Sequence, residues 1–184
     1  MSPHTTHLLT WGHGATVLEV FLEPTCPFSA RAFGKLDALL SRTGADKLTL
    51  KIRLQSQPWH TFSPVVCRAV LAAARGPGRR EAAWKVLAAV AAHREAFILE
   101  QHATGANLDQ SPRALLRLIE EFSGIPVLAD FQQTGLDMDL KWHARYARQN
   151  GIHGSPTFMV NGLIAPELSS GDDVDVWIEK LQLT

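Results

Sequence analysis

The sequence predicts one α/β domain, because a strand–helix–strand unit begins the chain while a helix, a two-strand hairpin and a final helix end it. Helices fill the region between these two halves. The expected elements, in chain order, are a strand at Thr16–Leu22, a helix at 27–41, a strand at 46–54, helices at 64–75, 79–102, 112–123 and 136–150, strands at Thr157–Val160 and 163–165, and a helix at 172–181. We therefore expect a single domain over residues 1–184, with a helical insertion at 57–135.

The opening unit follows from its hydrophobic pattern. Thr16–Leu22 (TVLEVFL) is short, apolar and rich in β-branched residues, which is typical of a buried strand. Residues 46–54 (DKLTLKIRL) alternate between polar and apolar, as a half-buried strand does. Between them, apolar residues such as Phe33 and Leu36 recur at helical spacing. A right-handed crossover between two parallel strands is the expected result.

Glycine, proline and asparagine mark the ends of the later elements. Gly76-Pro77-Gly78 separates the first two inserted helices, and Ser111-Pro112 supplies an N-cap and a first helical residue for the third. Gly151 ends the helix before the closing strands. Asn161-Gly162 is the strongest hairpin signal in the chain, so the two closing strands should pair.

Charge and composition exclude several classes of protein. Lys and Arg together number 18, as do Asp and Glu, so net charge gives no reason to expect nucleic acid or an anionic membrane. No apolar run could cross a bilayer, and residues 1–14 lack a signal-peptide core. The two cysteines, Cys26 and Cys67, and the histidines lack metal-site spacing, so we expect no metal and no bound cofactor. So few cysteines fit a reducing compartment, which predicts a cytoplasmic protein.

Cys26 lies where a strand passes into a helix, immediately before Pro27. Proline is well tolerated at the first helical position and favours extended backbone in the residue before it. Cys26 is therefore predicted to cap the helix, with the free amides of Phe28 and Ser29 directed at its sulfur. A helix N-terminus favours the thiolate, which is the attacking form of cysteine, so we predict that Cys26 is a nucleophile. The alternative is a small buried cysteine without special reactivity.

Two segments resemble one known family. VLEVFLEPTCPFSARAF, around Cys26, resembles the first strand and active site of DsbA-like proteins, where a Cys-Pro-X-Cys motif begins the helix. GIHGSPTFMVNG, at 151–162, is similar to their Gly-Val-X-Gly-Thr-Pro-Thr-Phe-X-Val-Asn-Gly segment. A helical insertion between the two halves of a thioredoxin fold is also the DsbA arrangement. The resemblance implies a thioredoxin fold, βαβ followed by αββα, with thiol chemistry at Cys26.

The resemblance also implies a substrate site. The family's proline that matches Pro156 is cis and faces the active-site cysteine, which would leave the backbone of Ser155 to pair with a peptide or with glutathione. Pro27 and Phe28, inside the motif, are further candidates for substrate contact. The alternative is a loop proline that only precedes an edge strand, since trans is the default for a bond to proline, but the match over twelve residues favours the substrate site.

Ser29 occupies the position of the motif's second cysteine. A serine forms no disulfide, so release of a mixed disulfide from Cys26 would need another thiol, for which glutathione is the obvious candidate. The Ser29 hydroxyl either donates to the thiolate or belongs to an ordinary first-turn serine. Cys67 lies in an apolar helical run, and we expect it in the core rather than as a resolving thiol.

Three other residues are candidates for the site. Glu19 is an acid in an apolar strand and resembles the buried glutamate of DsbA-like proteins, although one extra residue separates it from the cysteine. It either accepts a proton near that cysteine or pairs with Lys51 or Arg53. Trp59 and His60 follow the second strand and would reach the same sheet edge as the cysteine, unless they are plain packing and surface residues.

The sequence predicts a thiol-disulfide oxidoreductase or disulfide-isomerase-like enzyme that works through Cys26 alone. Its expected partners are a disulfide-containing or glutathionylated protein or a small thiol, with glutathione as co-substrate, and neither nucleic acid nor a membrane. A homodimer is compatible with the sequence. The alternatives are a glutathione transferase of the kappa type, whose members have serine at the position of Cys26, and a non-catalytic peptide-binding module.

Overall fold

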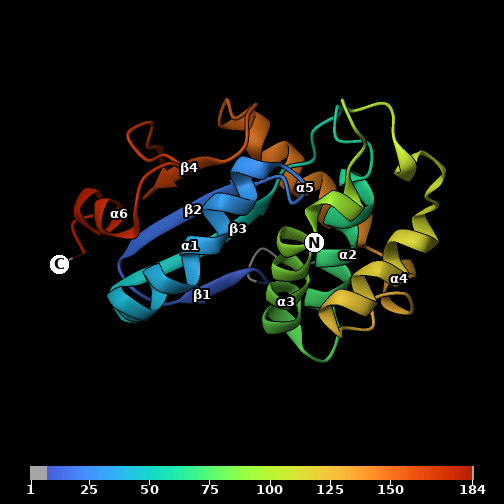
Figure 1. Cartoon of the computed structure of the whole chain (residues 1–184). Helices are drawn as coiled ribbons and strands as arrows, with labels where there is room; N and C mark the ends of the chain where they lie inside the picture. Colours follow the sequence, from blue (N-terminus) through green and yellow to red (C-terminus); the bar gives the residue numbers. More distant parts are fainter. Residues whose placement is uncertain (1–7, 184) are drawn as a thin grey trace.

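A five-stranded mixed sheet lies at the centre of the molecule, with strands in the order β1-β3-β2-β4-β5 (Figure 1). The computed structural model describes residues 8–183, so part of the stretch searched for a signal peptide, residues 1–7, lies outside it. The strands are β1 (Thr10–Gly12), β2 (Thr16–Leu22), β3 (Leu48–Leu54), β4 (Thr157–Val160) and β5 (Leu163–Ile164). β2 and β3 are parallel, and β4 is antiparallel to both β2 and β5, which confirms the predicted opening unit and hairpin.

β1 was not expected from the sequence. This three-residue strand pairs antiparallel with β3 at the edge of the sheet, and Trp11 lies opposite Leu50. It ends at Gly12, whose φ is +74° and where a Cβ atom would lie 2.0 Å from the carbonyl oxygen of Leu48. Only glycine fits this close approach of two backbones.

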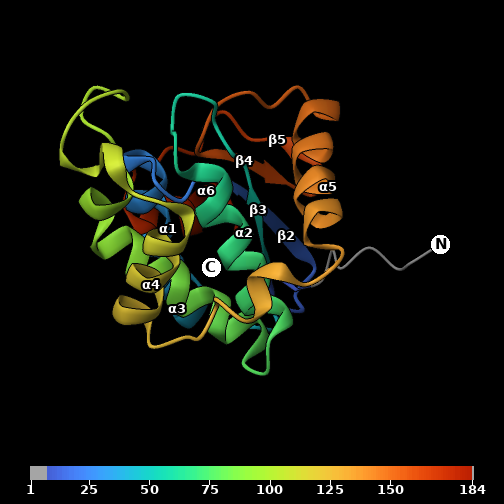
Figure 2. The same cartoon turned by 90° about the vertical axis from the view of Figure 1, so that its right-hand side faces the viewer.

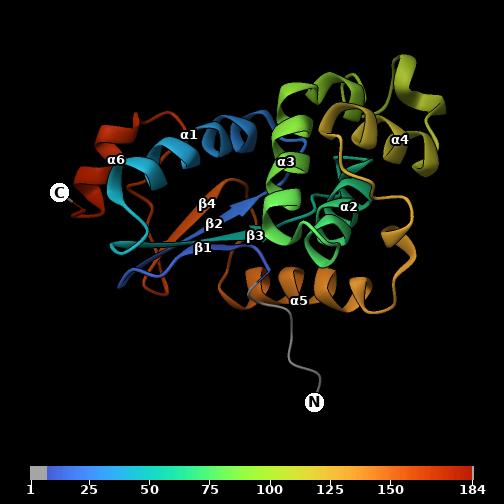
Figure 3. The ribbon, with the colours of Figure 1, turned by 90° about the horizontal axis from the view of Figure 1, so that it is seen from below.

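Helices cover both faces of the sheet. α1 (Pro27–Thr43) and α6 (Val174–Lys180) pack on one face, and α5 (Leu136–Gln149) packs on the other, as Figure 3 shows from below. The inner side of α1 carries Phe33, Leu36 and Leu39, all buried, which is the apolar stripe that the helical spacing predicts. Trp177 of α6 is fully buried against Phe158 of β4, with ring centroids 5.3 Å apart.

The inserted helices lie beside one end of the sheet in Figure 1, and they stand in front of the sheet in the view of Figure 2. They are α2 (Ser63–Arg75), α3 (Arg79–Ala92) and α4 (Pro112–Ser123), with short 3₁₀ turns at Arg94–Phe97, Ala106–Asp109 and Asp130–Gln132. One hydrophobic cluster runs through the insertion and the sheet, and includes Val70, Val86 and Leu115 together with Leu18 and Leu50. The division into one domain with an insertion at 57–135 stays a prediction.

The helix predicted at 79–102 is too long. α3 ends at Ala92, and Gln101 and His102 have positive φ values of 48° and 66°, which an α-helix does not allow. The physical reason is packing against α4. His93 stacks on Phe122 with centroids 4.0 Å apart, and Phe97 meets the same ring edge-on after the chain has turned, so the apolar pattern continues without a continuous helix.

None of the helices within residues 8–183 has the length and apolar character that crossing a bilayer requires.

Candidate active site around Cys26

Cys26 is the N-cap of α1, directly after β2, with Pro27 as the first helical residue. Its backbone is extended, with φ −76° and ψ 131°, as the following proline predicts. The expected hydrogen bonds from the amides of Phe28 and Ser29 to its sulfur are absent in this part of the chain. The thiol instead donates to the carbonyl oxygen of Ser155, 3.7 Å away.

The peptide bond between Ser155 and Pro156 is cis, and this loop faces Cys26 as the resemblance implied. Two side chains from the segment after β3 hold the loop in place. Gln55 donates to the carbonyl of Ile152 at 3.2 Å, and Gln57 donates to the carbonyl of His153 at 3.1 Å. Ser155 lies just before β4 and outside its ladder with β2. The roles of Ser155 and Pro156 in substrate binding stay predictions.

A buried polar network lies immediately behind Cys26. Glu23 is fully buried and accepts hydrogen bonds from the Thr25 hydroxyl at 2.7 Å and the Thr25 amide at 3.2 Å. Because the Thr25 hydroxyl donates to Glu23, its oxygen accepts from Nδ1–H of His60, which lies 3.1 Å away. The distance from His60 Nδ1 to the Glu23 carboxylate is 3.4 Å. This network joins the turn that holds Cys26 to the loop that follows β3.

Basic groups surround the same turn. Burial lowers the pKa of His60 below its usual value; Glu23 opposes this shift, while the charges of His102 and Arg94 add to it. Arg94 donates to the carbonyl of Thr25 at 3.4 Å, and the His102 ring stands edge-on to His60 with centroids 5.3 Å apart. This arrangement therefore favours a neutral His60 near neutral pH.

Three of the predicted site residues differ in burial: Ser29 is buried, whereas Phe28 and Trp59 are exposed. Ser29 is buried in the first turn of α1, where its hydroxyl oxygen accepts the amide hydrogen of Glu23 at 3.2 Å. No hydrogen bond joins it to Cys26 among residues 8–183. Phe28 and Trp59 are 53% and 50% exposed, which leaves both rings open to solvent near this edge.

Glu19 is paired with a cation and a hydroxyl group inside the fold. It is buried in β2, where Arg53 bonds it at 2.5 Å and the Tyr146 hydroxyl donates to it at 2.9 Å. The Arg53 guanidinium lies over the rings of Trp142 and Tyr146, at 4.9 and 5.0 Å from their centroids. Pairing with Arg53 was one of the two predicted roles for Glu19, and it is the role that the structure shows. The proton-accepting role near the cysteine stays a prediction.

The sequence interpretation missed four residues of this site: Glu23, Thr25, Arg94 and His102. The first two stand directly before Cys26 in Glu23-Pro24-Thr25-Cys26, so a buried acid ahead of a nucleophile was a usable signal. Arg94 and His102 follow α3 in the stretch that was predicted as helix, and nothing local marks them.

Cys67 is fully buried on α2, and burial raises the pKa of its thiol. Its sulfur lies 3.8 Å from the hydroxyl of Ser63. A buried thiol that resists ionisation is a poor nucleophile, so Cys67 fits the expected place in the core. Among residues 8–183, no three His, Cys, Asp or Glu side chains group together as metal ligands.

Comparison with known proteins relates this site to a family. No family model matches the chain, and neither does any curated protein sequence. The structure of "a putative protein-disulfide isomerase" from Pseudomonas syringae is 53% identical, covers 97% of this chain and 99% of its own, and superposes with a TM-score of 0.94.

More distant structures share the fold. DsbA of Chlamydia trachomatis is 17% identical, covers 99% of this chain and 93% of its own, and has a TM-score of 0.69. DsbA2 of Pseudomonas aeruginosa is 16% identical, covers 95% of this chain and 92% of its own, and has a TM-score of 0.66. Given the identity to the Pseudomonas syringae protein over nearly the whole chain, this protein belongs to the DsbA-like family of thioredoxin-fold thiol-disulfide oxidoreductases.

Proposed function

We propose that this protein catalyses monothiol disulfide exchange, with Cys26 as its one nucleophile and glutathione as the thiol that releases it. The observation that carries the proposal is that Ser29, and not a second cysteine, follows Cys26 by three residues in the first turn of α1. Ser29 stands where a second cysteine would close an intramolecular disulfide, and the other cysteine of the chain, Cys67, is buried in the core. A mixed disulfide on Cys26 must therefore be released by a thiol of another molecule.

The exchange has two steps. The Cys26 thiolate attacks one sulfur of a glutathionylated protein, forming a new disulfide to glutathione and releasing the protein thiolate, which takes up a proton. A second glutathione thiolate then attacks the sulfur of the bound glutathionyl group. Oxidised glutathione leaves, and Cys26 returns to its thiol form. Disulfide isomerisation would use the same first step, with a second substrate thiol as the group that releases Cys26.

The residues around Cys26 support this chemistry. The carbonyl of Ser155 already accepts from the Cys26 thiol, so the cis-proline loop stands beside the reacting sulfur. His60 is held through Thr25 to the buried Glu23, which fixes the turn that carries Cys26. Arg94 donates to the carbonyl of Thr25, so a guanidinium lies beside the turn that carries Cys26 and suits a carboxylate of glutathione. A cytoplasmic location would supply reduced glutathione.

The test is a turnover assay with a glutathionylated peptide and reduced glutathione, in which oxidised glutathione is measured. Wild-type and Cys67→Ala proteins should both turn over, and Cys26→Ser should be inactive. Equal rates for Cys26→Ser and wild type would overturn the proposal. Conjugation of glutathione to an electrophile without disulfide exchange would indicate the kappa-type transferase, and peptide binding without any turnover would indicate the non-catalytic module.

A further inference from the structure

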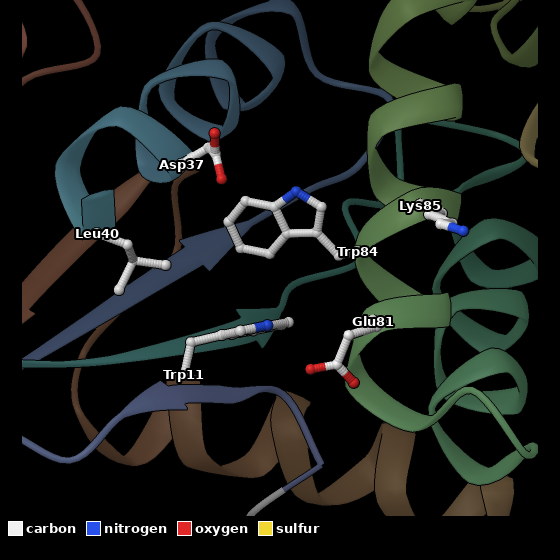
Figure 4. A pocket seen from close by; sticks show the side chains of 6 residues that line it. All are labelled: Trp11, Asp37, Leu40, Glu81, Trp84 and Lys85. Carbon is white, nitrogen blue, oxygen red and sulfur yellow. The ribbon is translucent and has the colours of Figure 1, made fainter. Parts of the chain in front are cut away.

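A second pocket lies away from Cys26, between the later turns of α1, the edge strand β1 and the start of α3. Its volume is about 310 Å³. The residues that line it are Trp11, Asp37, Leu40, Glu81, Trp84 and Lys85 (Figure 4). Asp37 comes 11 residues after Cys26 in the sequence, which is about 16 Å along a helix axis, so the pocket is separate from the thiol site.

Two indole rings form a corner of this pocket. The centroids of Trp11 and Trp84 are 4.9 Å apart, and their planes meet at 70°. Figure 4 shows Trp84 face-on with Trp11 edge-on beneath it. Phe33 packs against Trp84 with centroids 4.8 Å apart, which helps to hold that ring in place. Because the face of an indole ring is electron-rich, such a corner attracts an alkylated ammonium or a guanidinium group.

Acidic side chains lie on both sides of the rings. In Figure 4 the carboxylates of Asp37 and Glu81 flank Trp84 and Trp11, and the Lys85 ammonium points away from them. Arg80 donates to Glu81 at 2.7 Å and lowers the pKa of that carboxyl, so Glu81 is ionised. Asp37 makes no ion pair or hydrogen bond through its carboxylate within residues 8–183, which leaves its charge for a ligand.

We propose that this pocket binds an organic cation, held by the two indole faces and by the charge of Asp37. The chemistry is shared by a free quaternary ammonium compound and by an arginine side chain of a protein partner. The site does not depend on Cys26, so this proposal stands apart from the thiol chemistry.

The test is a titration of the full chain with choline and with its neutral isostere 3,3-dimethylbutan-1-ol, followed through the indole N–H signals of Trp11 and Trp84. Choline should shift both signals and bind more tightly than the isostere. A peptide with one central arginine forms a second arm, and its affinity relative to choline shows whether the natural cation is a protein side chain or a small molecule. Equal binding of choline and the isostere would overturn the assignment, as would the absence of any shift with choline and with the peptide.

Variants separate the two contributions. Trp84→Leu should weaken choline binding by roughly two- to thirtyfold, the range of a cation–π contact. Asp37→Asn should weaken it by about two- to fivefold without changing the affinity for the isostere. Asp109→Asn, a matched change at an exposed acid outside the pocket, should have no effect. Because Asp37 is exposed, Asp37→Asn should fold normally, and unchanged choline affinity in this variant would contradict the proposal.

Discussion

His143 lies buried on α5, where taking up a proton costs stability. Its Nδ1 accepts the amide hydrogen of Leu54 at 3.2 Å. Only 5% of the residue's surface is exposed to solvent. Burial, and then the positive charge of Arg53, lower its pKa to about 3. A free histidine has a pKa of about 6.5. Between these two values the unfolded chain holds a proton that the folded chain lacks, so the folded state loses stability as the pH falls below about 6.5.

The size of this loss follows from the two pKa values. From pH 7 to pH 5, His143 should lower the free energy of unfolding by about 2 kcal/mol, since each pH unit below 6.5 is worth about 1.4 kcal/mol. His143→Gln removes the titration while its amide oxygen can still accept from Leu54. The variant should be less stable at pH 7 but should lose about 2 kcal/mol less than wild type on moving to pH 5.

The assay is urea unfolding of both proteins at each pH, monitored by tryptophan fluorescence. The comparison cancels the other groups that titrate in this range, because both proteins contain them. If wild type and His143→Gln lose the same free energy between pH 7 and pH 5, then His143 is not held neutral by burial and the reasoning is wrong.

Three further predictions concern the site and its support. Ser29→Cys should allow a disulfide to Cys26, so oxidised variant protein should resist thiol alkylation; free thiols at both positions after oxidation would argue against the motif geometry. Arg53→Met should leave Glu19 buried without its cation and lower the free energy of unfolding by roughly 3–5 kcal/mol, and a loss below about 1 kcal/mol in urea would contradict this. Thr25→Val should cost about 1–3 kcal/mol, because it leaves two buried partners unsatisfied, and should slow the reaction of Cys26 with oxidised glutathione at unchanged circular dichroism.

Most of the fold could be predicted because its signals are local. The strand at Thr16–Leu22 and the strand at Thr157–Val160 were predicted with the bounds that the structure has. β1 could not be found this way, since three residues are too few to show alternation, and its pairing with β3 depends on residues about 40 positions away. The break after Ala92 depends on contacts with Phe122, which no pattern near residue 92 records.

The same distinction applies to the site. Cys26 and Pro156 were found because each sits in a recognisable local motif, and the structure brings their loops together. The network that joins Glu23, Thr25 and His60 could not be predicted in this way. Thr25 and His60 are 35 residues apart in the sequence, so only the folded chain shows their contact. Glu19 was a reasonable candidate from its place in an apolar strand, but its pairing with Arg53 and Tyr146 depends on contacts across 34 and 127 residues, which the local sequence does not show.

The most direct test of the central claim is intact-mass and peptide mass spectrometry of Cys67→Ala protein after incubation with oxidised glutathione. The account predicts one glutathionyl group, located on Cys26, that reduced glutathione removes, and no adduct on the variant that also carries Cys26→Ser. Failure of Cys26 to form this mixed disulfide, or an adduct that reduced glutathione cannot remove, would contradict monothiol exchange at Cys26.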